Sequence, residues 1–382
     1  MPSGDVLNLD SQLTPEQIVL RDRVRGWVDA EVLPIAGACH DESVFPETWL
    51  RGLASLGVFD GFLHAAPDPV AYGIVARELE RGGSPLRSVL SVQGALTMGA
   101  IAQFGSDEQR ETWLAPLSQL DAIGCFSLTE PNFGSNPSGM ETRAERTSTG
   151  FRITGHKRWA TNGTIADIAV VWAKLDDKVA GFLIETDRPG FHAIPIKQKW
   201  SFRASESAEL RLDGVEIPAS AQLPHARSLG AALRCLNLAR YGIAWGVVGA
   251  AQACLEETTD YLCARTQFAG KPIASHQLVQ GKLAWMAADV AAMHLMAWRL
   301  AALKADDTLQ PHQVSLVKMH NCRKALDVAR GCRDLLGANG VTMEHHVGRR
   351  MVDLETVVTY EGTEHIHQLV VGQHLTGISA FE

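Results

Sequence analysis

The spacing of apolar side chains divides the chain into three parts. The first helical pattern, LTPEQIVLRDRVRGWVDAEVLP, has apolar residues three to four positions apart, and Thr14, Pro15 and Gln17 form a helix-starting capping box. The same pattern continues through PVAYGIVARELERG, LRSVLSVQGALTMGAIAQFG and SDEQRETWLAPLSQL. We therefore predict an N-terminal α-helical domain over residues 1–124.

From residue 125 the pattern changes to short β-favouring runs. These runs, separated by Gly, Pro, Asn and Asp, are FRITGHKRWATNG, IADIAVVWAKL, VAGFLIET, FHAIPI and SAELRLDGVEIP. In the last run Leu210 and Leu212 alternate with charged residues, which is the two-residue period of a half-buried strand. We predict a small middle β domain, a barrel or a sandwich, over residues 125–226.

The C-terminal part, residues 227–382, contains long Ala- and Leu-rich helical stretches with loops at 266–275 and 304–311. This pattern predicts an antiparallel four-helix bundle. The fold class is then α+β and mostly α. The apolar faces are wide, which suits burial against other subunits, although a thick core within one subunit would give the same pattern.

Composition narrows the class of protein. With 382 residues, 46% of them apolar and 20% charged, the chain has the composition of an ordinary globular protein. Its formal charge of −8, without a basic stripe, favours neither nucleic acid nor a membrane as partner. The seven scattered cysteines form no CxxC pair, and we see no export signal and no uninterrupted apolar run of about 18 residues. We expect a cytoplasmic protein that binds small molecules or copies of itself.

The segment TYEGTEHIHQL, residues 359–369, brings together Glu361, Glu364, His365 and His367. Three interpretations are open: a metal site, a solvated loop, or a proton-transfer site around one carboxylate. Helical metal sites favour ligands three or four positions apart, and residues one or two apart face different directions, so we expect no metal. Taken alone, Glu361 would be a solvated carboxylate.

Five motifs occur in order along the chain: LTEPNFGSN (128–136), KRWATNG (157–163), RTQF (265–268), LLGANG (335–340) and TYEGTEHIH (359–367). Together with the helical–β–helical order, they resemble the acyl-CoA dehydrogenase family of FAD enzymes over essentially the whole chain. Four further segments most resemble the glutaryl-CoA dehydrogenase branch: LRSVLSVQ (86–93), METRA (140–144), ARYGIAWG (239–246) and HLTGISAF (374–381). The resemblance implies FAD as cofactor and a homotetramer.

The resemblance places Glu361 at the family's catalytic base. A base there removes the α-proton of an acyl-CoA thioester while the β-hydrogen leaves as hydride to the flavin. Burial raises the pKa of such a carboxyl and brings it closer to that of the weakly acidic C–H. In the family, the backbone N–H of this residue and a flavin ribityl hydroxyl stabilise the enolate. Some relatives carry the base on a bundle helix, at the position that Ala239 occupies here.

The resemblance also implies a substrate site. In the glutaryl branch an arginine at the position of Arg87 holds the distal carboxylate of a diacid, a task that suits the fork-shaped guanidinium. After oxidation, the diacid thioester can then lose CO₂. A single helical arginine is, however, most often a surface ion pair. The other implied substrate contacts are Ser88, Ser135, Ser205, Asn237, Arg240 and Tyr360.

The implied FAD contacts fall into three groups. The isoalloxazine is assigned to Leu128, Thr129, Trp159 and Thr161, and the pyrophosphate or pantetheine region to Ser135. The FAD of a neighbouring subunit is assigned to Arg265, Phe268, Gln277 and Gly337. The FAD diphosphate on the same subunit is assigned to Thr363 and His365. Without the resemblance, Trp159 would be core packing and GANG a helix C-cap.

The chain departs from the family pattern at several positions. The loop before DPVAYG is a short AAP, and Ala160 replaces a bulky β-branched residue, which we expect to leave space close to the flavin. One extra residue lies between Phe268 and Gln277, Gly331 replaces a common glutamine, and Ala338 replaces a glycine. The last three changes concern the dinucleotide end of the cofactor site.

Our leading hypothesis is an FAD-dependent α,β-dehydrogenase of the glutaryl-CoA type that passes electrons to an electron-transfer flavoprotein. The alternative keeps the fold and FAD but lets the reduced flavin react with O₂, as an oxygenase or oxidase acting on an unusual, cyclic CoA thioester in secondary metabolism. Space at Ala160 and the shortened loop motivate it. A third class is a flavin-free binding subunit, which Glu361, Trp159 and Thr161 disfavour.

Overall fold

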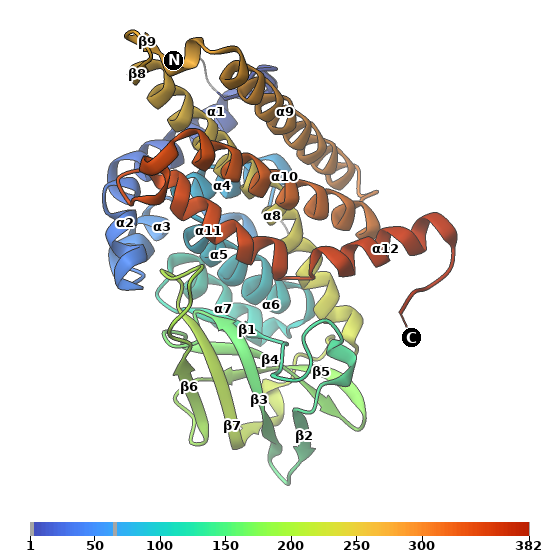
Figure 1. Cartoon of the computed structure of the whole chain (residues 1–382). Coiled ribbons are helices and arrows are strands. Elements are labelled where there is room, and N and C mark those ends of the chain that lie inside the picture. Colours follow the sequence, from blue (N-terminus) through green and yellow to red (C-terminus); the bar gives the residue numbers. More distant parts are fainter. Residues whose placement is uncertain (1–3, 64–66, 382) are drawn as a thin grey trace.

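The computed structural model describes residues 4–63 and 67–381. Figure 1 shows N-terminal helices, in blue to cyan, a sheet below them in green, and C-terminal helices in orange and red across the top. The predicted class, α+β and mostly α, with the three-part acyl-CoA dehydrogenase-like architecture, is confirmed.

The N-terminal helices begin as the sequence predicts. Thr14 and Gln17 form the reciprocal capping box ahead of the first helix. The helices are α1 (Pro15–Trp27), α2 (Leu33–Glu42), α3 (Glu47–Ser55), α4 (Pro69–Gly82), α5 (Ser84–Val89), α6 (Gly99–Phe104) and α7 (Asp107–Gln119), with 3₁₀ turns η1 (Leu9–Gln12) and η3 (Asp60–Leu63). Two segments, η2 (Val28–Val32) and η4 (Leu90–Met98), are wider π-helical turns. The η4 turn is wholly buried and joins α5 to α6.

The middle domain is a curled seven-stranded sheet. Its strands are β1 (Gly124–Ser127), β2 (Arg143–Arg146), β3 (Gly150–Thr161), β4 (Ile168–Leu175), β5 (Lys178–Glu185), β6 (Phe191–Pro195) and β7 (Ser207–Pro218), in the order β1-β4-β2-β3-β7-β6 with β5 paired to β4. The β1 and β2 strands run parallel to β4, and the other neighbours are antiparallel. Leu210 and Leu212 are buried while Arg211 between them is exposed, as the alternation predicts.

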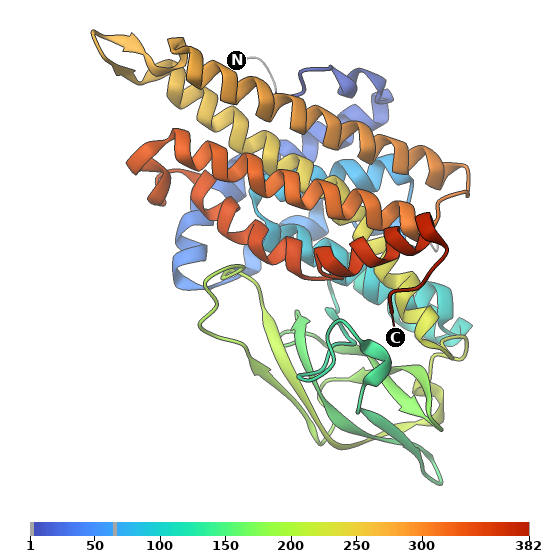
Figure 2. The same ribbon diagram turned by 45° about the vertical axis from the view of Figure 1, so that its right-hand side comes forward.

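The C-terminal helices are α8 (Leu229–Ala264), α9 (Gln277–Ala305), α10 (Pro311–Leu335), α11 (His346–Thr359) and α12 (Glu364–Thr376). A small hairpin of β8 (Thr266–Gln267) and β9 (Lys271–Pro272) lies between α8 and α9. Short 3₁₀ turns complete the chain: η5 (Pro137–Gly139), η6 (Ala219–Ala221), η7 (Ile273–Ser275) and η8 (Gly337–Val341). Figure 2 shows these helices stacked as a layer above the sheet. Because α8 packs against both α4 and α10, the two helical parts share one core.

The α9 helix presents an apolar face to solvent in the single chain. Leu278, Trp285 and Leu295 are exposed on it. By length and composition α9 could cross a membrane, and less than half of its most apolar window is buried. Core and interface helices of water-soluble proteins pass the same test, so this finding alone is weak evidence for a membrane span.

Candidate active site

Glu361 lies in the turn that joins α11 to α12. Its backbone is left-handed, with φ of 51°, and φ of Gly362 is 92°. Thr363 caps α12 by accepting a hydrogen bond from the Ile366 N–H at 3.2 Å. Part of Glu361 reaches the surface, but its Oε2 is buried and has no hydrogen-bond partner among the described residues. The carboxyl is therefore shielded from water and free to act on a bound molecule.

Burial raises the pKa of the Glu361 carboxyl above its ordinary value. The cations of Arg87, Arg240 and Lys318 oppose part of this shift. A raised pKa with a free buried oxygen is the state expected of a base that must take a proton from carbon.

Arg87 is fully buried beside this turn, with no exposed surface. Its Nε donates to Glu80, its Nη1 donates to Ser91 at 2.8 Å, and its Nη2 donates to the hydroxyl of Tyr360. Arg87 is therefore not a surface ion pair. Three of its five N–H groups are used, so one on each terminal nitrogen remains for another acceptor.

The structure brings several other predicted substrate residues to the same turn. Arg240 Nε donates to the backbone oxygen of Glu361 at 2.7 Å, and its Nη1 donates to Asn237 Oδ1 at 3.2 Å. Ser205 is buried near the end of the loop between β6 and β7, and its hydroxyl has no partner among the described residues. Asn237 and Arg240 are thus joined to the base by hydrogen bonds.

Two predicted substrate residues, Ser88 and Ser135, are not joined to Glu361 by hydrogen bonds among the described residues. Ser88 donates to the backbone oxygen of Pro85 at 2.7 Å within its own helix and is buried. Ser135 is exposed in the loop between β1 and β2. Among the described residues, neither side chain forms a hydrogen bond with the turn that carries Glu361, which we call the base turn.

The predicted isoalloxazine residues lie on β3 and on the segment that follows β1. Trp159 is 52% exposed with φ of 64°, and the Arg158 guanidinium lies 5.2 Å from its ring centroid. The Arg158 N–H donates to the oxygen of Thr129 at 2.9 Å, which holds the segment of Leu128 and Thr129 against the strand that carries Trp159 and Thr161. An indole left half-exposed in a rigid backbone fits a site that a flat ring system covers.

A buried ion pair, Lys157 with Glu130, fixes that segment and was missed from the sequence. The Nζ of Lys157 donates to Glu130 at 2.8 Å and to the oxygen of Leu128 at 3.1 Å. Glu130 also accepts from the N–H groups of Glu141 and Thr142. Glu130 lies in the motif LTEPNFGSN and Lys157 in the motif KRWATNG. The available signal was that one motif carries a negative charge and the other a positive charge.

The positions assigned to a neighbouring subunit's FAD are remote from the β domain. Arg265 and Phe268 belong to the β8–β9 hairpin region, and Gln277 starts α9. Both views place this hairpin at the end of the helical layer farthest from the sheet (Figures 1 and 2). Phe268 is 82% exposed, and Gly337 is exposed beyond the end of α10. One chain therefore does not bring these residues to its own Trp159.

Three of the departures from the family pattern have structural explanations. Ala160 packs into the β-domain core and is 1% exposed, so the prediction that it leaves space close to the flavin is wrong. The segment between Phe268 and Gln277, which carries the extra residue, begins in the three-residue turn 268–270, where every φ is positive. A side chain at Gly331 would meet the sulfur of Met286 at 2.8 Å. Residues 65 and 66 of the short AAP loop lie outside the described residues.

The crowded carboxylates and imidazoles of 361–367 point in different directions. Glu364 pairs with Arg323, His365 is exposed, and His367 is buried. Burial lowers the pKa of His367 to about 3, so its ring is neutral. Thr363 and His365, both assigned to the FAD diphosphate, lie at the N-terminus of α12, where backbone N–H groups favour an anion.

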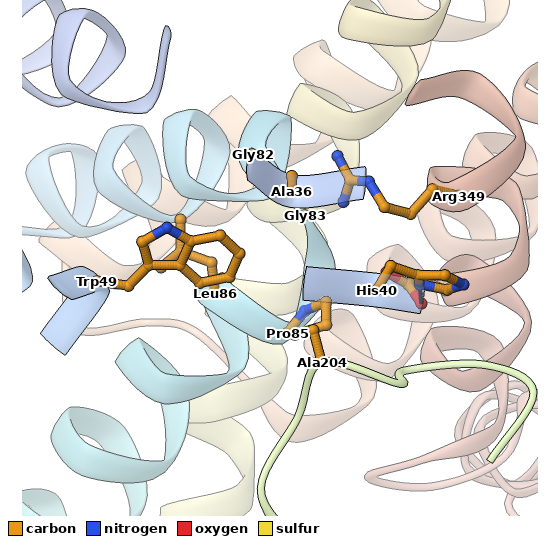
Figure 3. A pocket seen from close by; sticks show the side chains of 10 residues that line it. Ala36, His40, Trp49, Gly82, Gly83, Pro85, Leu86, Ala204 and Arg349 are labelled. Carbon is orange, nitrogen blue, oxygen red and sulfur yellow. Dashed lines mark ion pairs between the residues drawn. The ribbon is translucent and has the colours of Figure 1, made fainter. Parts of the chain in front are cut away.

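Two cavities lie outside this turn. One, of about 310 Å³, is lined by residues of α6, α8, the end of α9, the loop after it and the start of α10, including Arg234, Asn237, Tyr241 and Lys304. The other, of about 10 Å³, has room for about one water and is shown in Figure 3 with the His40 and Arg349 side chains near its rim. Gly83 has a φ of 149°, a conformation that residues with a Cβ rarely adopt, so this position favours glycine.

Comparison with known proteins identifies the family. The sequence matches its three domains, described as acyl-CoA dehydrogenase N-terminal domain over residues 14–121, middle domain over 125–215 and C-terminal domain over 229–376. This chain belongs to the acyl-CoA dehydrogenase family.

Individual relatives agree with this acyl-CoA dehydrogenase assignment. The mitochondrial short-chain specific acyl-CoA dehydrogenase of Bos taurus is 32% identical over 369 residues, which cover 94% of this chain and 89% of the relative. A crystal structure of a glutaryl-CoA dehydrogenase from Mycobacterium smegmatis in complex with FADH2 is 43% identical with a TM-score of 0.97, and covers 100% of both chains. A glutaryl-coenzyme A dehydrogenase glutaryl-CoA complex is 30% identical with a TM-score of 0.90, and covers 96% of each chain.

FAD is the cofactor of this acyl-CoA dehydrogenase family member. The residues of this chain fit it, because the half-exposed Trp159, its neighbouring Leu128–Thr129 segment and the free buried oxygen of Glu361 supply a flat surface and a base. FAD-dependent dehydrogenation of an acyl-CoA is supported at the level of the family.

Proposed function

We propose that this enzyme removes the α-proton and the β-hydride of a short dicarboxylyl-CoA of the glutaryl-CoA type. The observation that carries the proposal is the buried contact of Arg87 with Tyr360, the residue directly before Glu361. Glu361 takes the α-proton, and Arg87 holds the distal carboxylate of the acyl group. FAD supplies the hydride acceptor when it is bound.

The charge balance around the base supports a diacid. Three buried or nearly buried cations, Arg87, Arg240 and Lys318, face two carboxylates, Glu80 and ionised Glu361. Three positive and two negative charges leave one positive charge. A distal carboxylate would neutralise it, whereas a purely apolar acyl group would leave it uncompensated in a dry pocket.

The N–H groups of Arg87 that remain free support the same substrate class. Glu80 and Ser91 hold the guanidinium in place, so that binding a carboxylate does not have to order a flexible side chain. Glu80 and Ser91, at seven positions before and four positions after Arg87, were missed from the sequence. The four-residue helical spacing from Arg87 was an available signal for Ser91, whereas Glu80 lies on α4 and Arg87 on α5, so no local spacing relates that pair.

Acid–base chemistry permits decarboxylation after oxidation. In the oxidised diacid one methylene separates the distal carboxylate from the alkene that is conjugated with the thioester, and breaking the bond between that methylene and the carboxylate releases CO₂ and leaves a dienolate. The proton that Glu361 has taken is then available to quench that dienolate. Whether CO₂ leaves is read from the product.

The CoA arm is proposed to pass Arg240 and Asn237 toward the cavity of about 310 Å³ that Asn237 lines. Arg234 and Lys304 bring two cations to that cavity, and no carboxylate lines it among the described residues. Such a lining suits the phosphates and amides of coenzyme A. Ser135 and Ser205 are proposed as further contacts of this arm.

The same proposal includes a homotetramer. The β8–β9 hairpin, near the residues assigned to the FAD of a neighbour, lies at the end of the helical layer away from the sheet that carries Trp159, and α9 exposes Leu278 and Trp285. A second copy that covers these surfaces would complete each cofactor site. We propose that the enzyme is cytoplasmic and that neither a membrane nor nucleic acid is a partner.

The proposed electron acceptor is an electron-transfer flavoprotein. The alternative, reaction with O₂ on an unusual cyclic thioester, has lost the support of Ala160, which faces the β-domain core. A flavin-free binding role is disfavoured by the retained base and the half-exposed Trp159.

The test is anaerobic mixing of the FAD-loaded enzyme with a panel of CoA esters. Glutaryl-CoA is expected to bleach the flavin faster than butyryl-CoA, and Glu361→Gln to abolish bleaching while FAD stays bound. If glutaryl-CoA fails, and another ester gives a product carrying labelled oxygen after ¹⁸O₂ is admitted, the oxygenase replaces this proposal. A protein that stays colourless with added FAD removes both.

A further inference from the structure

Three consecutive backbone carbonyls in the base turn are bound by two cations from two different helices. The Nζ of Lys318, on α10, donates to the oxygens of Tyr360 and Gly362, both at 2.9 Å. The Nε of Arg240, on α8, donates to the oxygen of Glu361 at 2.7 Å. Lys318 thus binds the residue before the base and the residue after it with one ammonium group. We call this arrangement the carbonyl clamp.

The carbonyl clamp acts on a backbone that is unfavourable by itself. Glu361 has a φ of 51°, which side chains with a Cβ adopt only when the surroundings impose it. If the peptide before Glu361 rotated toward an ordinary conformation, the Tyr360 carbonyl would leave Lys318, and rotation of the peptide after Glu361 would take the Glu361 carbonyl away from Arg240. Lys318 is 1% exposed, so water could not replace the lost acceptor.

The turn also requires a glycine directly after Glu361. Gly362 has a φ of 92°, and a Cβ there would lie 2.8 Å from Nε2 of the buried His367. His367 on α12 and Lys318 on α10 therefore enclose the turn from two helices.

Lys318 has no ion-pair partner within the part of the chain that the structure describes. A buried lysine without a carboxylate is costly, and its burial lowers its pKa. An apolar side chain of the same length would fill the volume without that cost. What the ammonium adds is the pair of hydrogen bonds to the turn and a positive charge near the carboxyl of Glu361.

We propose that Lys318 is a positioning residue, which sets the left-handed turn that aims the Glu361 carboxyl at the substrate. The proposal rests on the proposed role of Glu361 as base. Lys318 touches neither the thioester nor the cofactor in this role and acts through the backbone of residues 360–362.

The test compares Lys318→Met with Lys324→Met as a matched control. Lys324 is on the same helix, is partly exposed, and pairs with Asp289 at 3.2 Å, away from the turn. Amide hydrogen exchange of residues 359–363 is measured without substrate. The limiting rate of anaerobic flavin bleaching is then measured against glutaryl-CoA concentration and pH.

For Lys318→Met we expect amide exchange in 359–363 to be at least about tenfold faster and the limiting rate at least about tenfold lower. The half-saturating substrate concentration should change less than about threefold. Loss of the nearby cation should move the acid limb of the rate to higher pH. Lys324→Met should resemble the wild type in every measurement.

The proposal is overturned if Lys318→Met changes neither the amide exchange of residues 359–363 nor the limiting rate of bleaching. It is also overturned if the variant only lowers the melting temperature and leaves the limiting rate and the acid limb unchanged. If Lys318→Met is not recovered folded, Lys318→Gln, which keeps N–H donors without the charge, is judged by the same criteria. Failure of the base assignment is separate, because Glu361→Gln would then retain bleaching. The exchange measurement needs no turnover, so it tests the carbonyl clamp whether or not Glu361 is the base.

Discussion

The guanidinium of Arg87 donates to the hydroxyl of Tyr360, and Tyr360 directly precedes Glu361 in the chain. This contact connects the proposed carboxylate-binding group to the turn that carries the proposed base. The ring of Tyr360 also packs edge-on against Phe202, which belongs to the loop between β6 and β7. Three parts of the fold therefore meet at one tyrosine.

The substrate class is tested at Arg87. Replacing Arg87 alone leaves Glu80 as an unpaired buried charge, so the informative variant is Arg87→Met combined with Glu80→Gln. We expect kcat/KM for glutaryl-CoA to fall, by a factor that corresponds to a loss of about 2–5 kcal/mol in transition-state stabilisation. The value for butyryl-CoA should change much less. Equal losses on both thioesters would contradict a role in binding the distal carboxylate.

The pH dependence of bleaching follows from the burial of Glu361. Burial raises the pKa of this carboxyl above the value of 4.5 for an ordinary glutamate, and only the ionised form can accept the α-proton. The rate should therefore fall as pH decreases through this raised pKa, with an acid limb above 4.5. Single-turnover bleaching measured across pH, with flavin content checked at each point, tests this. A rate that stays constant down to the pKa of a solvated glutamate would exclude Glu361 as a buried base.

The buried pair of Lys157 and Glu130 should matter for stability and for retention of FAD. Lys157→Met leaves Glu130 without its partner and frees the backbone oxygen of Leu128. We expect a loss of about 3–5 kcal/mol in the free energy of unfolding, and weaker FAD binding. Urea unfolding and flavin release measure the two effects. Lys178→Met, an exposed lysine of the same domain, is the control and should change neither.

Acid sensitivity should arise partly at Asp10. This carboxylate accepts hydrogen bonds from buried Arg77 at 2.6 and 2.9 Å. Burial by itself would raise the pKa of the Asp10 carboxyl. The contacts with Arg77 outweigh burial and lower this pKa from 3.8 to about 2. A depressed carboxyl pKa stabilises the fold above the unfolded value, so this contribution is present above pH 3.8 and is lost as pH falls toward about 2.

Asp10→Asn tests that contribution. It should cost about 1–2 kcal/mol of unfolding free energy at neutral pH, allowing for partial solvent screening, and almost nothing near pH 2. Chemical denaturation at several pH values measures the difference. A cost that does not depend on pH would show that the Asp10 charge does not contribute.

Several parts of the fold could be predicted because their signals are local. The capping box of Thr14 and Gln17 and the alternation around Leu210 each lie within a few residues, and each is confirmed. The metal interpretation of 361–367 was disfavoured from spacing, and the side chains of Glu364, His365 and His367 lie in different environments.

Other parts could not be predicted, because they depend on which residues meet across the fold. The direction of Ala160 follows from a bulge in the pairing of β3 with β7, which no local pattern records. Ser88 and Arg87 are adjacent in sequence, yet Ser88 donates to its own helix while Arg87 reaches Tyr360. Whether a buried charge has a partner is decided by segments far away in the chain.

The sequence by itself determined the order of the helical and β parts and the motifs, since periodicity and motif spacing are properties of neighbouring residues, and the family resemblance that the motifs carry pointed to Glu361 as the candidate base. Only the tertiary structure decided that Lys318 and Arg240 bind the carbonyls around that base, and that Glu80 and Ser91 orient Arg87. These contacts join α4, α5, α8, α10 and the turn before α12. Their free energy comes from desolvated charges that meet only when the helices pack together.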